Sequence, residues 1–270
     1  MNSNGEGSAF NLSYNLEESF VLADNFFSEG NNGFTVLNQN ISSLRENFDN
    51  FLIFFKSLNK SPDLIVLTEI WIESSEINRF NIFGYNLFSK CNDNYRSGGV
   101  VIYVSQKYSS IEDPVVMTCA DGVKVTVNLC SNVKLSVIAI YRLHAFHVSD
   151  FINELNSVLV DKKDDNLIFT GDINICTLKY SLQVFEYQSL LASYGFYELI
   201  NKPTRVVGNS ASCLDHIYFR SKQNLFLFDS EVVPSGRSDH DISLCYLVLK
   251  LSECRLSGIN DINRLRAPKA

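Results

Sequence analysis

The chain has 270 residues, of which 46% are hydrophobic, and this length can bury the core of one large domain or two small ones. Its net charge of -7 argues against a broad basic surface that coats nucleic acid. A local rim of Lys and Arg could still hold phosphate groups, and bound metal would neutralise part of the negative charge.

The cysteines lack the spacing of a metal-binding or redox motif, since no CxxC pair is present. Several lie inside apolar runs, as Cys245 does between Leu244 and Tyr246. We therefore expect small buried thiols in a reducing compartment instead of disulfides or zinc ligands. The polar residues 1–9 do not resemble a secretory signal, and no apolar run approaches the roughly 18 residues that span a bilayer. These features predict a soluble intracellular protein.

Residues 1–33 are rich in Asn, Ser, Gly and Glu, and we expect a loosely ordered leader in which Phe20 and Phe27 allow a short helix. Strands are predicted over residues 34–39, 64–67, 98–104, 124–129, 134–141, 167–170, 213–219 and 242–249. Helices are predicted over residues 44–58, 148–160 and 185–194. Residues 251–270 are mostly polar and are expected to form a tail.

Helices separate several of the predicted strands, while other strands lie in apparent hairpins. This mixture predicts an α/β fold in which two packed sheets carry helices on their outer faces. No Pro/Gly/Ser-rich linker divides residues 34–250, so we expect a single domain over this range.

Two predicted strands end in side chains that a packed core does not need. Glu69 follows the apolar run 64–67, and Asn40 follows the run that begins at Phe34. An unpaired buried carboxylate is strongly disfavoured, whereas a hard cation such as Mg²⁺ selects carboxylate and amide oxygens. We therefore interpret both residues as metal ligands. The alternatives are a salt-bridged strand end for Glu69 and a turn or cap for Asn40.

A third apolar run ends in Gly-Asp-Ile-Asn at residues 171–174. Gly171 allows a tight bend, and residues two positions apart face the same side of an extended backbone. Asp172 could then orient or deprotonate a water molecule, while Asn174 holds that water or a phosphate oxygen. A turn closed by the Asp172 side chain is an equally good interpretation of these residues.

An acid and an imidazole precede the last predicted strand, at Asp239 and His240. A histidine paired with a carboxylate is more easily kept cationic, which suits the stabilisation of a pentacovalent phosphate. Asp215 is our candidate partner for His240. The adjacent His216 is interpreted as a hydrogen-bonded structural residue, and the other two histidines are given no role.

Two further segments could touch a phosphate backbone. Residues 202–205, Lys-Pro-Thr-Arg, form a basic and constrained loop, for which a solvated turn is a comparable interpretation. Tyr141 ends another apolar strand and could donate its hydroxyl to a phosphate. Most tyrosines at strand ends simply pack, so the assignment of Tyr141 depends on a family resemblance.

Taken in chain order, these segments resemble the endonuclease/exonuclease/phosphatase superfamily, and most closely the apurinic-like endonuclease domain of non-LTR (LINE-type) retrotransposons. The phrases that carry the resemblance are Leu37-Asn38-Gln39-Asn40-Ile41, Leu67-Thr68-Glu69-Ile70-Trp71, Arg96-Ser97-Gly98-Gly99-Val100, Ile138-Ala139-Ile140-Tyr141-Arg142 and Asn201-Lys202-Pro203-Thr204-Arg205. Each phrase is weak alone, but together in this order they identify the superfamily over residues 34–250. The resemblance implies a four-layer α/β sandwich of two mostly antiparallel sheets, and a Mg²⁺ or Mn²⁺ ion at one edge. It also implies nicking of one DNA strand, with the nucleus as the site of action.

The resemblance also implies a role for each candidate residue. Glu69 becomes the main metal ligand, with Asn40 beside it and Asp239 near the metal. Asp172 positions or deprotonates the attacking water, and Asn174 supports it.

The remaining candidates act on the phosphate in this scheme. Tyr141 contacts the scissile phosphate, and His240, oriented by Asp215, stabilises the transition state. Two positions depart from the family pattern, since Ser42 stands where cellular base-excision enzymes have an acid, and Leu143-His144 stand where retroelement relatives often have a proline pair.

Full retrotransposons carry a reverse transcriptase after this domain, and no Tyr/Phe-x-Asp-Asp motif in apolar context occurs in this sequence. Two alternatives therefore stay open. The first is a superfamily hydrolase of another phosphoester, such as RNA, a phosphoinositide or sphingomyelin. The second is a catalytically idle relic.

Overall fold

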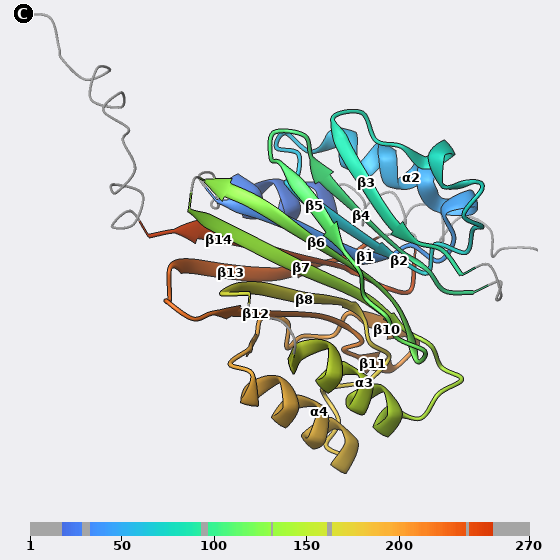
Figure 1. Cartoon of the computed structure of the whole chain (residues 1–270). Coiled ribbons are helices and arrows are strands. Elements are labelled where there is room, and N and C mark those ends of the chain that lie inside the picture. Colours follow the sequence, from blue (N-terminus) through green and yellow to red (C-terminus); the bar gives the residue numbers. More distant parts are fainter. Residues whose placement is uncertain are drawn as a thin grey trace, which may run out of the picture.

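The computed structural model describes residues 18–28, 33–92, 97–130, 132–160, 164–235 and 238–250. Two six-stranded sheets face each other (Figure 1). In spatial order, the first sheet consists of β13 (Phe226–Val233), β14 (Ile242–Leu249), β1 (Phe34–Asn40), β2 (Leu64–Thr68), β4 (Val100–Ser105) and β3 (Tyr85–Lys90). The second consists of β5 (Ser110–Asp113), β6 (Ala120–Cys130), β7 (Val133–Arg142), β8 (Asn166–Asp172), β12 (Asp215–Ser221) and β9 (Tyr197–Glu198). A separate hairpin pairs β10 (Arg205–Val207) with β11 (Ser210–Ser212).

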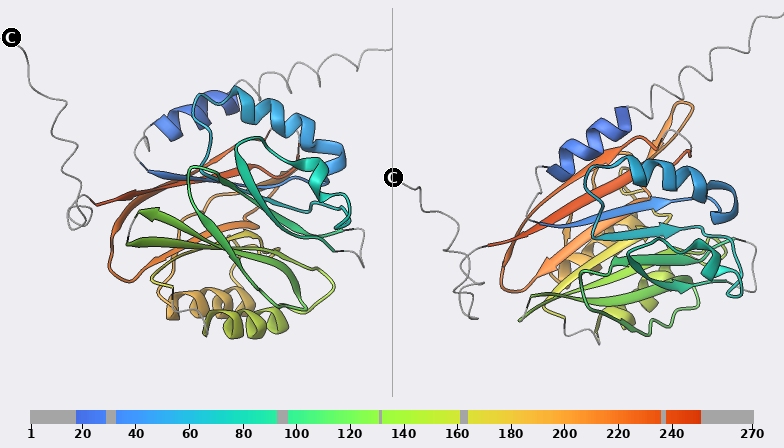
Figure 2. Two further views of the ribbon diagram at one scale, coloured as in Figure 1. Left: turned by 45° about the horizontal axis from the view of Figure 1, so that its top comes forward. Right: turned by 90° about the horizontal axis from the view of Figure 1, so that it is seen from above.

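Helices cover the outer face of each sheet, so that the molecule has four layers (Figure 2). The helix α2 (Leu44–Ser57) and a helix over residues 18–28 lie on the first sheet, whereas α3 (Val148–Val160) and α4 (Leu182–Ser193) lie on the second. A short 3-10 helix spans Ile77–Phe80. The predicted α/β sandwich is thus confirmed. Within the described ranges, no helix is long and apolar enough to cross a membrane.

The central strands are apolar on both faces because each face packs against another layer. On β1, Phe34 and Val36 belong to the core between the sheets, while Leu37 belongs to the core under the helices. A strand buried on both sides reads as a continuous apolar run, which is why these strands are visible in the sequence.

The strands that carry the polar candidate residues end or begin at one edge of the sandwich. Among the strands that the structure describes, β1 with β2 and β7 with β8 are parallel, and the other pairs are antiparallel. The strands β1, β2, β7 and β8 therefore end at the same edge as one another, and the antiparallel β12 and β14 begin there. Asn40 and Asp172 meet at this edge although they come from different sheets. The topology thus brings distant parts of the chain to one place.

The predicted leader extends too far into the chain. Residues 18–28 form a helix in which Ala23 and Phe27 are fully buried. Phe20 stacks on Phe54 of α2 at 5.4 Å between ring centroids, and Phe26 packs on Tyr246 of β14 at 5.0 Å. This helix belongs to the outer layer because its apolar side chains recur at helical spacing and complete the cover of the first sheet. Residues 1–17, residues 29–32 and the predicted tail 251–270 lie outside the described residues.

Several strands were not predicted, and they lie away from the centres of the sheets. All residues of β3 except the last are half-buried, and the outermost strand β13 carries Asp229, Ser230 and Glu231 among its apolar residues. An edge strand packs on one side only and keeps polar residues on the other, so it lacks the continuous apolar signal of a central strand.

The docked helix gives a test of the domain boundary. Replacing the fully buried Phe27 with Ala should lower the free energy of unfolding by about 3–5 kcal/mol, through lost apolar burial and a cavity. The control Val21→Ala lies on the same helix at 59% exposure and should change it by less than about 0.5 kcal/mol. Urea unfolding of both variants measures the difference, and equal stabilities would show that the helix does not dock.

Candidate active site

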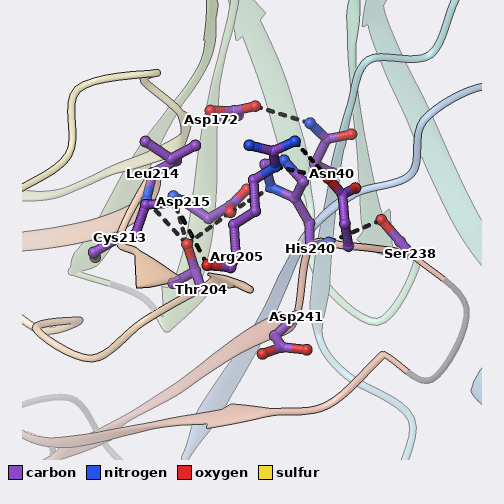
Figure 3. A network of polar contacts seen from close by, with 12 residues as sticks. Asn40, Asp172, Thr204, Arg205, Cys213, Leu214, Asp215, Ser238, His240 and Asp241 are labelled. Carbon is purple, nitrogen blue, oxygen red and sulfur yellow. Dashed lines mark hydrogen bonds and ion pairs between the residues drawn. The ribbon is translucent and has the colours of Figure 1, made fainter. Parts of the chain in front are cut away.

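A hydrogen bond between the two sheets marks the centre of the site. Nδ2 of Asn40 donates to Oδ2 of Asp172 at 2.8 Å, and both side chains are fully buried (Figure 3). Oδ1 of Asn40 accepts from the backbone N–H of Ser42 at 3.0 Å. Each of the two strand-end residues is therefore held in a fixed orientation.

Asp172 is a buried acid among other acids. Burial, and then the charge of Asp215, raises the pKa of Asp172 to about 8, with a further contribution from Glu69. The cationic charge of His240 and the hydrogen bond from Asn40 oppose this rise. Several carboxylates thus share one small space, which favours either a proton or a cation among them.

Of the two interpretations of residues 171–174, the structure shows the turn and not the extended backbone. The φ of Asn174 is 55°, so the backbone leaves the extended conformation before the two side chains can face the same side. Its N–H donates to Oδ1 of Asp172 at 3.0 Å, which is the turn closed by the Asp172 side chain, and its Nδ2 donates to the carbonyl of Arg142 at 3.1 Å. Asn174 therefore lies beside Asp172 and fixes that carboxylate through its backbone.

Gly171 is required by close packing as well as by the turn. A Cβ at this position would lie 1.9 Å from the carbonyl oxygen of Ile140 on the neighbouring strand β7, and the φ of Gly171 is 128°. No other residue type fits this approach between the strands that carry Tyr141 and Asp172.

Arg142 hydrogen-bonds to the loops around Asp172. It was not identified as a site residue from the sequence. Its guanidinium is buried and donates to the carbonyls of Ile173 at 2.7 Å, Asn174 at 3.0 Å and Phe146 at 3.2 Å. These bonds join the loop after β8 to the loop after β7. The only sequence signal was the Tyr-Arg pair at the end of an apolar strand.

His240 and Asp215 form the predicted pair. Nδ1 of His240 donates to Oδ2 of Asp215 at 2.7 Å (Figure 3). Burial alone would lower the pKa of His240, but the hydrogen bond and charge of Asp215, with the charges of Asp172 and Asp239, raise it to about 9. His240 is therefore cationic at neutral pH.

Thr204 completes this pair. It lies in the basic segment 202–205 identified from the sequence, but its role beside Asp215 was not predicted. Its fully buried hydroxyl donates to Oδ2 of Asp215 at 2.8 Å and accepts the backbone N–H groups of Leu214 and Asp215, each at 3.0 Å. The donor and both acceptor positions of this hydroxyl are therefore occupied by groups at the beginning of β12. Thr204 thus sets the direction of the carboxylate that holds His240.

Arg205 and Asp239 lie at the rim beside His240. Nε and Nη2 of Arg205 contact Oδ2 of Asp239 at 2.7 and 2.6 Å, and both side chains are partly exposed. A β-bridge joins Arg205 to His240, which attaches the β10–β11 hairpin to the segment that carries the imidazole. The charge of Asp239 is therefore shared with Arg205 in this structure.

Glu69 lies on a loop with unusual backbone angles. The φ values of Glu69 and Trp71 are 54° and 50°, which non-glycine residues seldom adopt. The loop is held by the N–H of Ser43, which donates to the Glu69 carbonyl at 2.8 Å, and by the N–H of Trp71, which donates to the Gly98 carbonyl at 3.1 Å. Such strain is maintained by surrounding contacts, and it often marks a functional position.

Asp121 anchors the turn that supports the Glu69 loop. Its Oδ2 accepts the N–H of Gly99 at 2.8 Å, and a Cβ at Gly98 would lie 2.7 Å from the same oxygen. This buried acid on β6 is the register partner of Tyr141 on β7. Asp121 had no recognisable signal in the sequence, because its partners, the Gly99 N–H and the Asn92 side chain, lie far from it in the chain.

Tyr141 faces the acids and stays protonated. Burial, and then the charges of Glu69 and Asp172, raises its pKa above the ordinary value of 10.0. The phenol is therefore a hydrogen-bond donor at the floor of the site, next to Glu69.

The residues fit a divalent cation. Asp172, Asp215 and His240 can bring ligand atoms within 4.8 Å of one another. However, Nδ1 of His240 is bonded to Asp215, and its raised pKa keeps the ring protonated, so His240 is poorly suited to ligate a metal. The oxygen atoms of Glu69 and Asn40 suit a hard cation, which would also reduce the repulsion that raises the pKa of Asp172.

Sequence comparison identifies the family. A model of the endonuclease/exonuclease/phosphatase family matches residues 12–240. The chain belongs to this family. A comparison with curated protein sequences finds no match.

Solved structures share the fold at low sequence identity. The endonuclease domain of TRAS1, a telomere-specific non-LTR retrotransposon, has a TM-score of 0.64 at 16% identity, over 80% of this chain and 99% of that one. TDP2 of D. rerio in complex with a single-strand DNA product has a TM-score of 0.60 at 16% identity, over 80% and 98%. The AP endonuclease LMAP of Leishmania major has a TM-score of 0.65 at 11% identity, over 92% and 100%. These likenesses support the architecture in which the candidate site lies.

His216 lies behind the site and has a structural environment. Nε2 donates to the carbonyl of Cys213 at 3.3 Å, so in the neutral ring Nδ1 accepts from the Tyr187 hydroxyl at 2.9 Å. Burial lowers the pKa of His216 to about 4. The geometry agrees with the structural interpretation of this residue.

The buried neutral imidazole predicts an acid-sensitive fold. Between its ordinary value of 6.5 and about 4, His216 binds a proton in the unfolded chain but not in the folded one. The free energy of unfolding should therefore fall by about 3 kcal/mol as the pH is lowered through this window. His216→Gln, which keeps a donor and an acceptor, should remove this part of the slope in urea unfolding. The exposed control His147→Gln should retain it, and identical slopes in both variants would contradict a neutral buried His216.

Proposed function

We propose that the protein is a metal-dependent DNA endonuclease that nicks one strand and leaves a 3′ hydroxyl. The observation that carries this proposal is the buried Asp172, held by Asn40 on one side and lying next to the cationic His240–Asp215 pair on the other. An acid that can take a proton, beside a fixed positive charge, is the arrangement that hydrolysis of a phosphodiester requires.

Each side chain has one part in this scheme. Asp172 takes the proton of the attacking water, whose oxygen forms the new bond to phosphorus as the bond to the leaving 3′ oxygen breaks. That oxygen takes a proton from solvent water and becomes the 3′ hydroxyl. Asn174 holds Asp172 through its N–H. His240 donates to a phosphate oxygen through Nε2, since Nδ1 is bonded to Asp215, and Tyr141 donates its hydroxyl to the same phosphate.

Glu69 and Asn40 are the proposed ligands of Mg²⁺ or Mn²⁺, and Asp239 offers its second oxygen. The cation, when bound, supplies positive charge that lowers the pKa of Asp172 and stabilises the charge that develops on the phosphate. Asp121 and the turn at Gly98 hold the loop that presents Glu69.

Two observations support DNA as the proposed substrate: the proteins with similar structures, and the β10–β11 hairpin at the rim of the site. The similar structures include a retrotransposon endonuclease domain, an AP endonuclease, and TDP2 with a single-strand DNA product. The β10–β11 hairpin stands beside His240, and its exposed Val206 and Val207 could contact the sugar and base edges of a strand. We propose the nucleus as the site of this activity.

Nicking of supercoiled plasmid tests the proposal. Glu69→Ala and Asp172→Asn should each lower the rate by at least about 100-fold, because one loses a metal ligand and the other the proton acceptor. EDTA should abolish the activity of the parent protein, and Mg²⁺ or Mn²⁺ should restore it. Glu112→Ala, an exposed acid on the edge strand β5, is the control that should nick normally. Equal nicking by all variants, or by none while RNA or a phosphoinositide is hydrolysed, would refute a DNA endonuclease.

Thr204 provides a second test of the His240–Asp215 pair. Thr204→Val keeps the shape but removes the donor to Asp215, and kcat should fall about tenfold, which corresponds to about 1.4 kcal/mol. Thr204→Ser keeps the hydroxyl and should recover most of the rate, while KM for the plasmid stays the same in both. A change in KM alone would assign Thr204 to substrate binding instead of to the orientation of His240.

A further inference from the structure

A layer of polar side chains lies between the two sheets, one step deeper in the core than the candidate active site. Asn38, Thr170 and Ser243 are fully buried. Both Nδ2 and Oδ1 of Asn38 and the hydroxyls of the other two have no hydrogen-bond partner among the described residues, and the same is true of the Thr68 hydroxyl and of Oδ1 of Asp215. Protein interiors seldom leave so many neighbouring polar atoms unpaired.

Strand geometry places these side chains opposite one another. Asn38 and Ser243 are direct partners in the register of β1 and β14. Side chains alternate along a strand, so Asn38 projects to the same side as Asn40, and Thr170 to the same side as Asp172. Because Asn40 bonds Asp172 across the sheets, Asn38 and Thr170 both project into the core between the sheets, each two residues before a member of that bond.

Asp215 connects this layer to the site. Its Oδ2 accepts from Thr204 and His240, whereas Oδ1 is buried without a donor from the described residues. Ile217, one step deeper on the same face of β12, is the register partner of Thr170. Thr170 and Asp215 are therefore diagonal neighbours on the same face of the β8–β12 pair, and a donor for Oδ1 can come from between them.

The unpaired atoms of this layer include both hydrogen-bond donors and acceptors, and this determines what could bind between them. A buried cation would satisfy the oxygen atoms but would oppose the N–H groups of Asn38. Water can donate to Oδ1 of Asn38 and of Asp215 and can accept from Nδ2 of Asn38, while each hydroxyl can do either. Buried water molecules characteristically bridge polar groups of this kind.

We propose that Asn38, Thr170 and Ser243 form an internal water site between the sheets, and that its water donates to Oδ1 of Asp215. The water hydrogen-bonds Oδ1 of this carboxylate, as Thr204 hydrogen-bonds Oδ2. The carboxylate then keeps the orientation in which it holds His240 toward the phosphate. Asn38 and Thr170 are thus positioning residues. The effect on catalysis rests on the proposed function, whereas the existence of the water site does not.

Magnetic relaxation dispersion of water nuclei tests the site directly, because it detects internal water with long residence times. The parent protein should show such a signal, and Asn38→Leu, of similar volume but apolar, should lose it. Thr170→Val, which replaces one hydroxyl by a methyl group, should reduce the signal even if Asn38→Leu does not fold. Thr126→Val on the outer face of the second sheet is the control and should retain it. A signal of equal size in the parent protein, Asn38→Leu and Thr170→Val would overturn the proposal.

Nicking kinetics test the positioning role separately. Thr170→Val should lower kcat about tenfold with KM unchanged, and Thr170→Ser should restore it, since a misplaced supporting group reduces the rate without touching substrate. Unchanged kcat in a Thr170→Val protein that has lost the water signal would overturn the positioning role. If the parent protein does not nick DNA at all, the proposed function fails, and the dispersion measurement still decides whether the water site exists.

Discussion

The hydrogen bond between Asn40 and Asp172 is the constraint on which the site depends. It crosses from one sheet to the other at the edge where β1 and β8 both end. A carboxylate in this place is buried on all sides, and the surrounding structure serves to hold it there. Gly171 lets the neighbouring strand approach, and Arg142 ties down the loops on either side. The acid is costly to bury, and these contacts keep its position fixed.

The second half of the site is built from backbone and side chain together. Thr204 directs Asp215, which directs His240, and the β10–β11 hairpin is bridged to the same segment through Arg205. The imidazole therefore depends on residues 204–215, which precede it by at least 25 positions in the chain. Glu69 is supported in the same way, since a strained loop is held by a glycine turn that Asp121 anchors.

The sequence predicted more of the fold than of the contacts within the candidate site. The central strands could be predicted because both of their faces are buried, which gives continuous apolar runs. Glu69, Asp172 and His240 could be identified as candidates because charged residues next to apolar runs are seldom explained by packing alone. Asp121 and Thr204 could not, because each acts on backbone N–H groups of a distant segment, and such contacts leave no mark in the local pattern. The sequence could not decide between a turn and an extended backbone at Asn174, because that choice depends on one left-handed residue. The helix at 18–28 was assigned to a leader because its polar neighbours dominated the composition.

The position of β14 has a consequence for biosynthesis. This strand is the last in the chain among the described elements, yet it lies inside the first sheet, between β13 and β1. A nascent chain therefore carries Asp172 long before it carries His240, and its first sheet stays open between strands made early and late. A chain that ends before residue 240 has Asp172 without the imidazole, and its first sheet lacks the strand between β13 and β1. Completion of the candidate site is thus coupled to the synthesis of nearly all of the described residues.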